Sequence, residues 1–156
     1  MNVINLHIEA SSYCNARCPG CPRNAYGYPL EGFYKEAHFT TEKLSEILEK
    51  FPNVRSILYC GNHGDPMMNP KIVELCTNDK YISIATNGGI GRLDDYKRLA
   101  EIGTHITFGI DGLEDTNHLY RQGVKWHNLM KRVETFISAG GQATWQFIRF
   151  KHNMDQ

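Results

Sequence analysis

Short apolar segments alternate along this chain with longer segments in which apolar residues recur at helical spacing. The first of the short segments alternates Ile4, Leu6 and Ile8 with polar neighbours. Alternation of strand and helix patterns favours a parallel β-sheet whose strands are joined by helical crossovers. The fold class that we predict is therefore α/β. The five expected strands are Ile4–Ile8, Ile57–Cys60, Tyr81–Ala85, Ile106–Ile110 and Thr144–Phe150.

Residues with strong capping preferences mark the expected ends of the helices. Thr40 is expected to cap the first helix, and Asn69 followed by Pro70 is expected to begin the second. Gly103 is expected just past the end of the third helix. The last helix carries a continuous apolar stripe, which typically packs against a sheet. The stripe consists of Trp126, Leu129, Met130, Val133, Phe136 and Ile137.

Length and charge restrict the possible classes of protein. The 156 residues are enough for one hydrophobic core, so we expect residues 1–156 to form a single domain. The chain has 17 basic and 17 acidic residues and no long run of one sign. This balance offers no extended electrostatic surface to nucleic acid or to an anionic membrane. We therefore expect neither as a partner.

The beginning of the chain does not resemble an export signal. Residues 1–10 alternate apolar and polar and include His7 and Glu9, whereas a signal peptide has a basic start and an apolar centre. No stretch approaches the length of a membrane span. The cysteines number five, an odd count that does not suggest a disulfide framework. Together these features predict a reducing, cytoplasmic location.

Three of the cysteines lie within one short segment, Tyr-Cys-Asn-Ala-Arg-Cys-Pro-Gly-Cys, as Cys14, Cys18 and Cys21. Each iron of a four-iron cluster needs one outside ligand, and electron-transfer clusters usually have four cysteines. Three thiolates therefore leave one iron open, and an incomplete centre can do chemistry. A structural zinc site is the alternative, and it requires a fourth ligand such as His7 or His38.

The other two cysteines have different surroundings in the sequence. Cys60 ends an apolar segment, and Cys76 lies on the apolar side of a predicted helix. Free cysteines in such positions usually behave as small buried hydrophobic residues. We therefore expect neither of them to act as a metal ligand.

Chemically distinctive segments follow four of the predicted strands. The cysteine triplet follows the first strand, Gly61–Asp65 the second, Thr86–Asn87 the third and Asp111 the fourth. The carboxyl ends of parallel strands meet at one edge of a sheet, where ligands bind. We therefore expect these segments to form one site.

The order of the motifs resembles that of a known family. After the cysteine triplet come Gly61-Asn62-His63-Gly64-Asp65-Pro66, Thr86-Asn87-Gly88, Gly109-Ile110-Asp111-Gly112 with Tyr120-Arg121, and Trp145-Gln146-Phe147-Ile148. This series resembles the radical S-adenosylmethionine (radical SAM) superfamily over nearly the whole chain. The pattern is most similar to the branch that modifies peptides, proteins and small metabolites.

The resemblance implies a parallel-stranded, partial TIM-like barrel. The core of the family has six strand–helix units, whereas this chain supplies five strands and four intervening helices. We therefore expect an open barrel that lacks the last strand–helix unit and any C-terminal extension with auxiliary clusters. Proteins usually cover an exposed last strand, so a homo-oligomer that covers it is also expected.

The resemblance further implies the cofactors and the residues that hold them. Cys14, Cys18 and Cys21 would bind a [4Fe-4S] cluster, and the amino and carboxylate groups of S-adenosylmethionine would chelate the open iron. The residues expected to bind S-adenosylmethionine are Gly61, Asn62, His63, Gly64, Asp65, Thr86, Asn87, Asp111 and Arg121.

Individual roles follow from the same resemblance. Asp65, where the family more often has glutamate, would accept a hydrogen bond from the amino group. Arg121 would bind the carboxylate with paired donors. Thr86, Asn87 and Asp111 would contact the ribose or the carboxylate.

Three further positions are less clear from the sequence. His63 is a candidate for contacting substrate or carrying a proton, although a histidine in such a loop more often bonds within the loop itself. Gly20 stands where relatives often have an aromatic or apolar residue, and Gly109 where many have serine.

The implied reaction is reductive cleavage of S-adenosylmethionine to methionine and a 5'-deoxyadenosyl radical, which abstracts hydrogen from an unidentified peptide or small-molecule substrate. A low-potential electron donor of the flavodoxin or ferredoxin type is implied as a partner. Two other functions stay open at the level of sequence. They are a non-catalytic or truncated iron-sulfur-binding protein and a zinc-stabilised interaction module.

Overall fold

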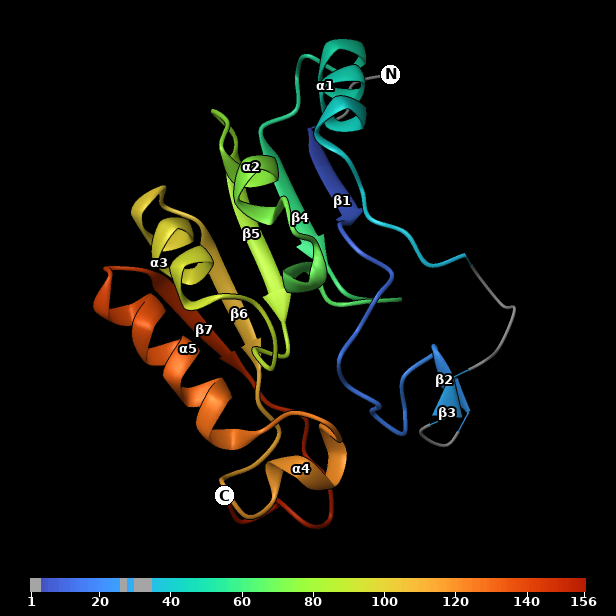
Figure 1. Cartoon of the computed structure of the whole chain (residues 1–156), viewed down its shortest axis with the longest axis vertical. Coiled ribbons are helices and arrows are strands. Elements are labelled where there is room, and N and C mark those ends of the chain that lie inside the picture. The colour runs from blue at the N-terminus through green and yellow to red at the C-terminus, as the bar shows by residue number, and fades with distance from the viewer. Residues whose placement is uncertain (1–3, 26–27, 30–34) are drawn as a thin grey trace.

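The computed structural model describes residues 4–25, 28–29 and 35–156, and its main feature is one open, parallel sheet (Figure 1). The strands lie in the order β1-β4-β5-β6-β7, so each strand pairs with the next one in the main sheet. Their bounds are β1 Asn5–Glu9, β4 Ser56–Cys60, β5 Tyr81–Thr86, β6 His105–Gly109 and β7 Gln142–Gln146. The predicted class, an open α/β sheet of five parallel strands, is confirmed.

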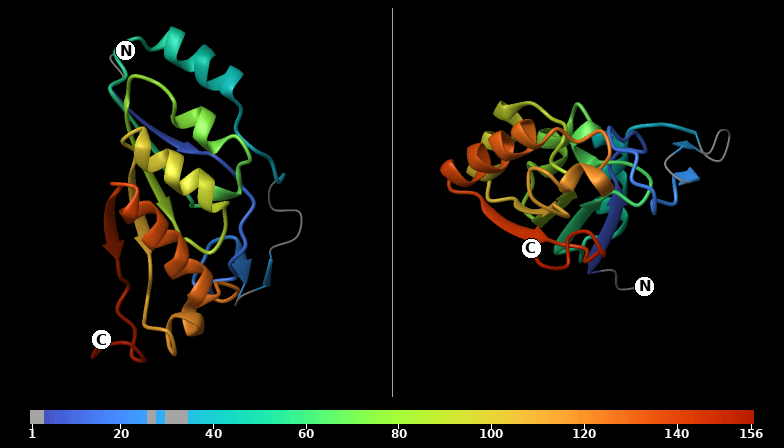
Figure 2. Two further views of the ribbon diagram at one scale, coloured as in Figure 1. Left: turned by 60° about the vertical axis from the view of Figure 1, so that its left-hand side comes forward. Right: turned by 90° about the horizontal axis from the view of Figure 1, so that it is seen from below.

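Helices cover one face of this sheet (Figure 2). A short 3-10 helix, η1, precedes α2, and the small helix α4 lies in the connection between β6 and α5. The helical bounds are α1 Thr41–Lys50, η1 Pro66–Met68, α2 Ile72–Cys76, α3 Leu93–Glu101, α4 Asn117–Tyr120 and α5 Trp126–Ser138.

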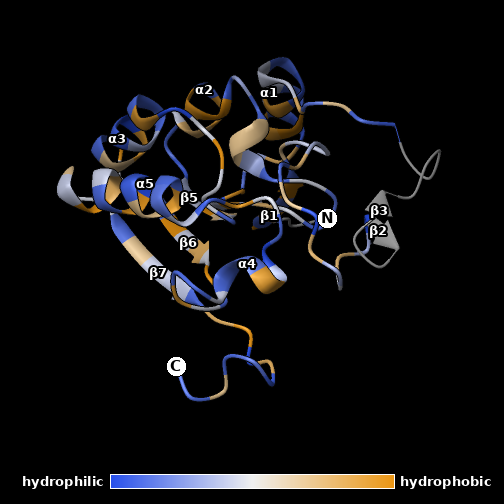
Figure 3. Ribbon diagram, turned by 60° about the horizontal axis from the view of Figure 1, so that its bottom comes forward, coloured by the Kyte–Doolittle hydropathy of each residue, from blue (hydrophilic) through white to orange (hydrophobic). Residues whose placement is uncertain are grey.

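The core lies between the helices and the sheet. The register aligns Tyr59 with Ile84 and Ile84 with Ile106, so one apolar row crosses three strands. All three side chains are fully buried, as are Leu129 and Phe136 of α5. In Figure 3, β6 is largely hydrophobic and the outward turns of α3 and α5 are hydrophilic. This distribution is the one expected for a sheet with helices on one face.

The other face of the sheet carries mainly polar residues. Asn5 on β1 bonds to Ser56 on β4 through their side chains at 2.6 Å, and His105 on β6 bonds to Thr144 on β7 at 2.9 Å. Because successive side chains of a strand point to opposite faces, these polar positions alternate with the buried apolar row. This face is therefore available for polar contacts.

Two of the predicted helix ends are confirmed. The hydroxyl oxygen of Thr40 accepts a hydrogen bond from the backbone N–H of Lys43, which caps α1. Gly103 lies two residues beyond α3 with a φ of 78°, a conformation that costs glycine little.

The predicted start of the second helix was wrong. Helix α2 begins at Ile72 with Lys71 as its N-cap, whereas Pro70 lies before the helix. The Asn69 amide nitrogen instead donates to the carbonyl oxygens of Ala10 and Phe39, at 2.7 and 2.9 Å. Asn69 therefore connects three segments, and its Oδ1 also accepts from the backbone N–H of Lys71 at 2.9 Å just before α2.

The predicted last strand extended too far. Pairing with β6 ends at Gln146, whose carbonyl accepts from the backbone N–H of Ile110. Two residues later, the backbone N–H of Ile148 donates to the Asp111 carboxylate instead of to a backbone carbonyl of a neighbouring strand. The chain leaves the sheet at this point because a side chain, not a neighbouring strand, satisfies its backbone.

Two further features of the fold concern its periphery. The loop after the cysteine triplet contains a two-stranded antiparallel pair, β2 Asn24–Ala25 and β3 Tyr28–Pro29, which the sequence pattern did not predict. Within the part of the chain that the structure describes, no helix is long and apolar enough to cross a membrane.

Candidate functional site

A cavity of about 260 Å³ lies at the carboxyl ends of the strands. Residues from the loop after β1 and from the ends of β5, β6 and β7 contribute to its wall. The residues that were predicted for the site all line this cavity, except His63 and Asp111. Those in the wall are Cys14, Cys18, Cys21, Gly61, Asn62, Gly64, Asp65, Thr86, Asn87 and Arg121.

Backbone hydrogen bonds hold the cysteine loop in place. The N–H of Cys21 donates to the carbonyl of Cys18 at 3.0 Å and closes a turn. The N–H of Arg17 donates to Gln122 at 2.9 Å, and the carbonyl of Tyr13 accepts from Asp65 at 2.8 Å. The loop is thus tied both to the segment after α4 and to the segment after β4.

The thiols of the triplet have polar neighbours but lie in a partly dry environment. Burial, reinforced by the charge of Asp65, raises the pKa of Cys14 to about 11. Burial also raises the pKa of Cys18, which the nearby Arg121 guanidinium opposes. The Cys14 and Cys18 thiols are therefore protonated near neutral pH in the metal-free site, and a bound metal would have to displace these protons.

Two side chains direct N–H groups at sulfur atoms of the triplet. The amide nitrogen Nδ2 of Asn87 lies 3.6 Å from Cys14 Sγ, and Nη1 of Arg121 lies 3.9 Å from Cys18 Sγ. The N–H of Ala16 also points to Cys14 Sγ, at 3.4 Å. Hydrogen bonds of this kind stabilise a thiolate, the form in which cysteine binds metal.

The three thiols of the triplet line one cavity. Among the described residues, no group of three His, Cys, Asp or Glu side chains is close enough to hold one metal ion. A four-iron cluster does not require such closeness, because each cysteine binds a different iron. The common opening of Cys14, Cys18 and Cys21 onto one cavity is the feature that a cluster needs.

Asp65 joins the loops after β4 and β5. Its carboxylate accepts hydrogen bonds from the backbone N–H groups of Met67 at 2.9 Å and Asn87 at 2.8 Å, and from the hydroxyl of Thr86 at 2.8 Å. Burial raises the pKa of Asp65, which these donors oppose. The side chain is thus committed to bracing the site, and its predicted contact with an amino group stays a prediction.

Glu9, at the end of β1, is a residue of this region that the sequence reasoning missed. Its carboxylate accepts from the backbone N–H groups of Asn62 at 2.8 Å and His63 at 3.3 Å. It also lies 3.7 Å from Cys60 Sγ, which contacts His7 Nε2 as well. The parallel register, which the sequence does not show, pairs Glu9 with the residue just before the Gly61 loop and so brings the two together.

Asp111 lies behind the cavity rather than in its wall. One carboxylate oxygen accepts from Nε of Arg121 at 2.6 Å, and the other accepts from the backbone N–H of Ile148 at 2.7 Å. Its carbonyl accepts from the Asn153 side chain at 2.8 Å. The side chain of Asp111 is completely buried. The Asp111 carboxylate therefore holds both Arg121 and the segment after β7 in place.

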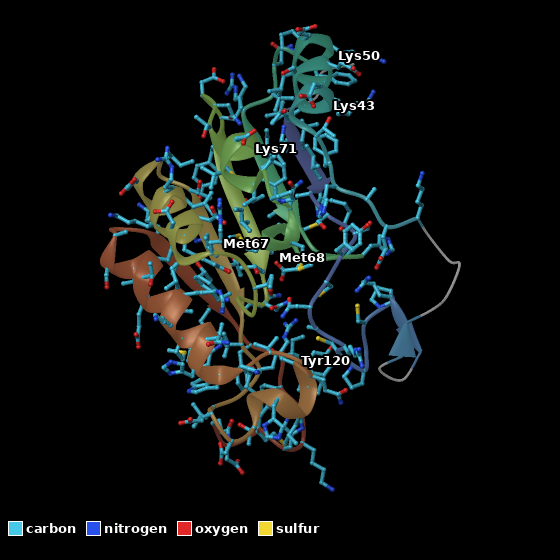
Figure 4. The ribbon with its side chains drawn as sticks, viewed as in Figure 1. Lys43, Lys50, Met67, Met68, Lys71 and Tyr120 are labelled. Carbon is cyan, nitrogen blue, oxygen red and sulfur yellow. The ribbon has the colours of Figure 1, made fainter. Side chains whose placement is uncertain are left out.

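The two unusual glycines make room for neighbouring side chains. A Cβ atom on Gly109 would lie 2.5 Å from Nη2 of Arg121, and one on Gly20 would lie 3.2 Å from the Tyr120 hydroxyl. Tyr120, which belongs to a predicted motif but was not assigned to the site, lines the cavity and packs on Phe150 with ring centroids 4.4 Å apart. Figure 4 shows Tyr120 beside the loop that follows β1.

Curated proteins with similar sequences include two from microorganisms. The chain is 29% identical over 123 residues to the tungsten-containing aldehyde ferredoxin oxidoreductase cofactor-modifying protein of Pyrococcus furiosus, covering 76% of this chain and 33% of that protein. It is 26% identical over 121 residues to the AdoMet-dependent heme synthase of Nitratidesulfovibrio vulgaris, covering 74% and 32%. The chain thus spans about a third of the length of each match.

Solved structures with the same fold include anSMEcpe with bound AdoMet. That structure matches with a TM-score of 0.70 and 20% identity, over 92% of this chain and 44% of the other. Streptococcus suis SuiB bound to S-adenosylmethionine matches with a TM-score of 0.69 and 19% identity, over 92% and 32%. At this level of identity the likeness shows the fold alone.

The family itself is established by a match that covers most of the chain. The family model described as the Radical SAM superfamily matches residues 8–149, a range that begins in β1 and ends beyond β7. This range includes the cysteine triplet and the whole wall of the cavity. The chain therefore belongs to the radical SAM superfamily.

Proposed function

We propose that this chain binds a [4Fe-4S] cluster through Cys14, Cys18 and Cys21 and cleaves S-adenosylmethionine reductively beside it. The observation that carries the proposal is the opening of all three thiols onto one cavity at the carboxyl ends of the strands. Members of the superfamily bind this cluster and this cofactor, and the structural neighbours anSMEcpe and SuiB contain S-adenosylmethionine.

A cluster held by Cys14, Cys18 and Cys21 would supply one electron for cleavage of S-adenosylmethionine to methionine and a 5'-deoxyadenosyl radical, which would take a hydrogen atom from the substrate. The chain itself contributes binding and orientation. Backbone groups of the Gly61–Gly64 loop reach the cavity, where a carbonyl could accept from an amino group. Gly61 and Gly64 let this loop pack closely, because backbone atoms occupy the space that their side chains would need. A Cβ atom on Gly64 would lie only 1.9 Å from the carbonyl oxygen of Ser11.

Other polar groups in the cavity wall suit the rest of the cofactor. The Arg121 guanidinium, one of two arginine side chains in the wall, could attract a carboxylate. Thr86 and Asn87 also line the cavity, and contacts to a ribose would have to share their hydrogen bonds to Asp65 and Cys14. The Asp111 carboxylate would act on the cofactor only through Arg121, because both its oxygens are already bonded.

The partners follow from the chemistry of the proposed reaction. Reduction of the cluster requires a low-potential electron donor, for which a flavodoxin or a ferredoxin is suitable. The substrate would be a peptide or a small molecule that enters the same cavity. The identity of that substrate depends on details of the site that vary within one fold.

The proposal is tested by anaerobic reconstitution of the chain with iron and sulfide. The reconstituted protein is reduced with S-adenosylmethionine present, and mass spectrometry measures 5'-deoxyadenosine. Cys18→Ala is expected to lose both the four-iron cluster and the product. Cys60→Ala is the matched control, because Cys60 is also buried but lies outside the cavity wall, and it is expected to retain the cluster.

Each result of this experiment has a definite meaning. Product that depends on Cys18 would support the proposed reaction. A cluster without product would support a non-catalytic iron-sulfur protein instead. Uptake of zinc in place of iron would favour the zinc-stabilised module, and a full four-iron cluster in Cys18→Ala would refute the ligand assignment.

A further inference from the structure

Arg121 is a cationic side chain that directs an N–H group at a sulfur of the cysteine triplet. Its Nη1 atom lies 3.9 Å from Cys18 Sγ, while its Nε atom donates to Asp111 at 2.6 Å. Only 18% of the Arg121 side chain is exposed, and Cys18 is buried. In such surroundings water screens a charge poorly, so the guanidinium acts strongly on the sulfur.

The position of the guanidinium is closely determined. Asp111 is itself fixed by the backbone N–H of Ile148, so the carboxylate that holds Arg121 cannot move freely. Gly109 leaves the space for Nη2, because a Cβ atom at this position would lie only 2.5 Å away. The ring of Tyr120 lies below the guanidinium, 5.5 Å from ring centroid to Cζ. Four residues therefore keep a positive charge beside Cys18.

We propose that Arg121 raises the reduction potential of the cluster held by the triplet. Reduction adds one negative charge to the cluster, and a nearby fixed cation stabilises the more negative state. An N–H group directed at a ligand sulfur acts in the same direction. Asp111 carries the opposite charge, but it contacts Nε, whereas Nη1 is the nitrogen directed at Cys18.

This inference rests on the proposed function, because it requires a cluster on Cys14, Cys18 and Cys21. It differs from the binding of a carboxylate by Arg121, because the effect on the potential exists without S-adenosylmethionine. The two roles can therefore be separated by measuring the potential of the cluster before any S-adenosylmethionine is added.

The test is a redox titration of the reconstituted full chain without S-adenosylmethionine, followed by electron paramagnetic resonance. Arg121→Gln is expected to lower the reduction potential of the cluster by about 59 mV. At a fixed solution potential, the ratio of reduced to oxidised cluster then falls roughly tenfold, because one electron is transferred. Arg121→Lys keeps the charge, and the reduction potential of its cluster is expected to lie between those of Arg121→Gln and the wild type. Arg55→Gln is the matched control, because Arg55 precedes β4 at the opposite end of the sheet.

A second variant moves the guanidinium without removing any charge. Gly109→Ala places a Cβ atom against Nη2, and the flexible arginine has to shift. Gly109 does not have a positive φ, so alanine is compatible with its backbone. The expected result is an unchanged iron content with a potential below that of the wild type. This variant keeps the inference testable if Arg121→Gln fails to assemble a cluster.

The outcomes distinguish failure of the inference from failure of the proposed function. Equal potentials in the wild type, Arg121→Gln and Gly109→Ala, each with four irons, would overturn the inference alone. A wild-type chain that takes up no iron would overturn the proposed function and the inference together. Lower reduction potentials in Arg121→Gln and Gly109→Ala, with the potential of Arg55→Gln equal to that of the wild type, would support the inference.

Discussion

Asp65 shows how one buried carboxylate can organise two loops of the site. Its oxygens accept from two backbone N–H groups and from the Thr86 hydroxyl, and only 3% of the residue is exposed. Aspartate is one methylene shorter than glutamate. The shorter side chain remains close to its own backbone, where it bonds to Met67.

Replacing Asp65 with asparagine is expected to destabilise the chain. The amide NH2 group would face donors that now share a carboxylate, so at least one of them would lose its partner. We expect the free energy of unfolding to fall by about 1–3 kcal/mol, measured by urea denaturation. Asp115→Asn, at an exposed position, serves as the control and is expected to leave the stability unchanged. Equal unfolding midpoints for Asp65→Asn and the wild type would contradict the bracing role.

The buried thiols predict how stability depends on pH in the metal-free chain. Burial, with Asp65 near Cys14 and Glu9 near Cys60, raises the pKa of both thiols to about 11 from an ordinary value of 9.0. The folded chain therefore retains protons that the unfolded chain releases above about pH 9. Stability is expected to be fully present below pH 9 and to fall between pH 9 and 11.

Urea denaturation at a series of pH values checks this expectation. A Cys14→Ser and Cys60→Ser double variant removes the two thiols, so its stability is expected to decline less steeply over the same interval. An identical slope in the double variant and the wild type would show that other groups cause the decline.

At the scale of single elements, the first helix depends on a local cap. The Thr40 hydroxyl accepts the N–H of Lys43, which otherwise has no partner within the first turn. Thr40→Ala is expected to cost about 1 kcal/mol of stability in urea denaturation. Ser45→Ala, an exposed change in the middle of α1, is the control, and a loss as large as that of Thr40→Ala would argue against a capping effect.

The last helix and strand form an apolar groove. The groove has a volume of about 390 Å³ and lies between α5 and β7. Ile137 and Trp145, which line it, are 52% and 57% exposed. The predicted stripe of α5 is thus buried on one side only, through Leu129 and Phe136. The stripe was interpreted as packing on the sheet, and this is correct for the buried side alone.

At the scale of the whole molecule, this groove bears on the expected homo-oligomer. Every residue of β7 is exposed, so its edge and the adjoining groove are open to another surface. If copies associate here, sedimentation of the wild type is expected to depend on concentration, and Ile137→Lys to weaken the association. Glu134→Lys, on an exposed position of α5 outside the groove, is the control. A wild type that stays monomeric at all concentrations would contradict the expectation.

The fold was more predictable than the roles of the site residues. Strand positions were correct to within a residue or two for four strands, because local alternation and burial agree. The end of β7 was wrong because it depends on Asp111, which is distant in the sequence. Glu9 and Tyr120 were missed because nothing in their local sequence indicates which loops they contact.

The sequence by itself determined the parallel α/β class, the family and the gathering of the triplet, Gly61–Asp65 and Thr86–Asn87 at one edge. It could do so because strand order and direction follow from local patterns and right-handed crossovers. Only the tertiary structure decided which groups are free to bind a cofactor. Asp65 and Asp111 differ little from other loop carboxylates in sequence, but their partners come from Asn87, Arg121 and Ile148, which only folding brings within hydrogen-bonding distance.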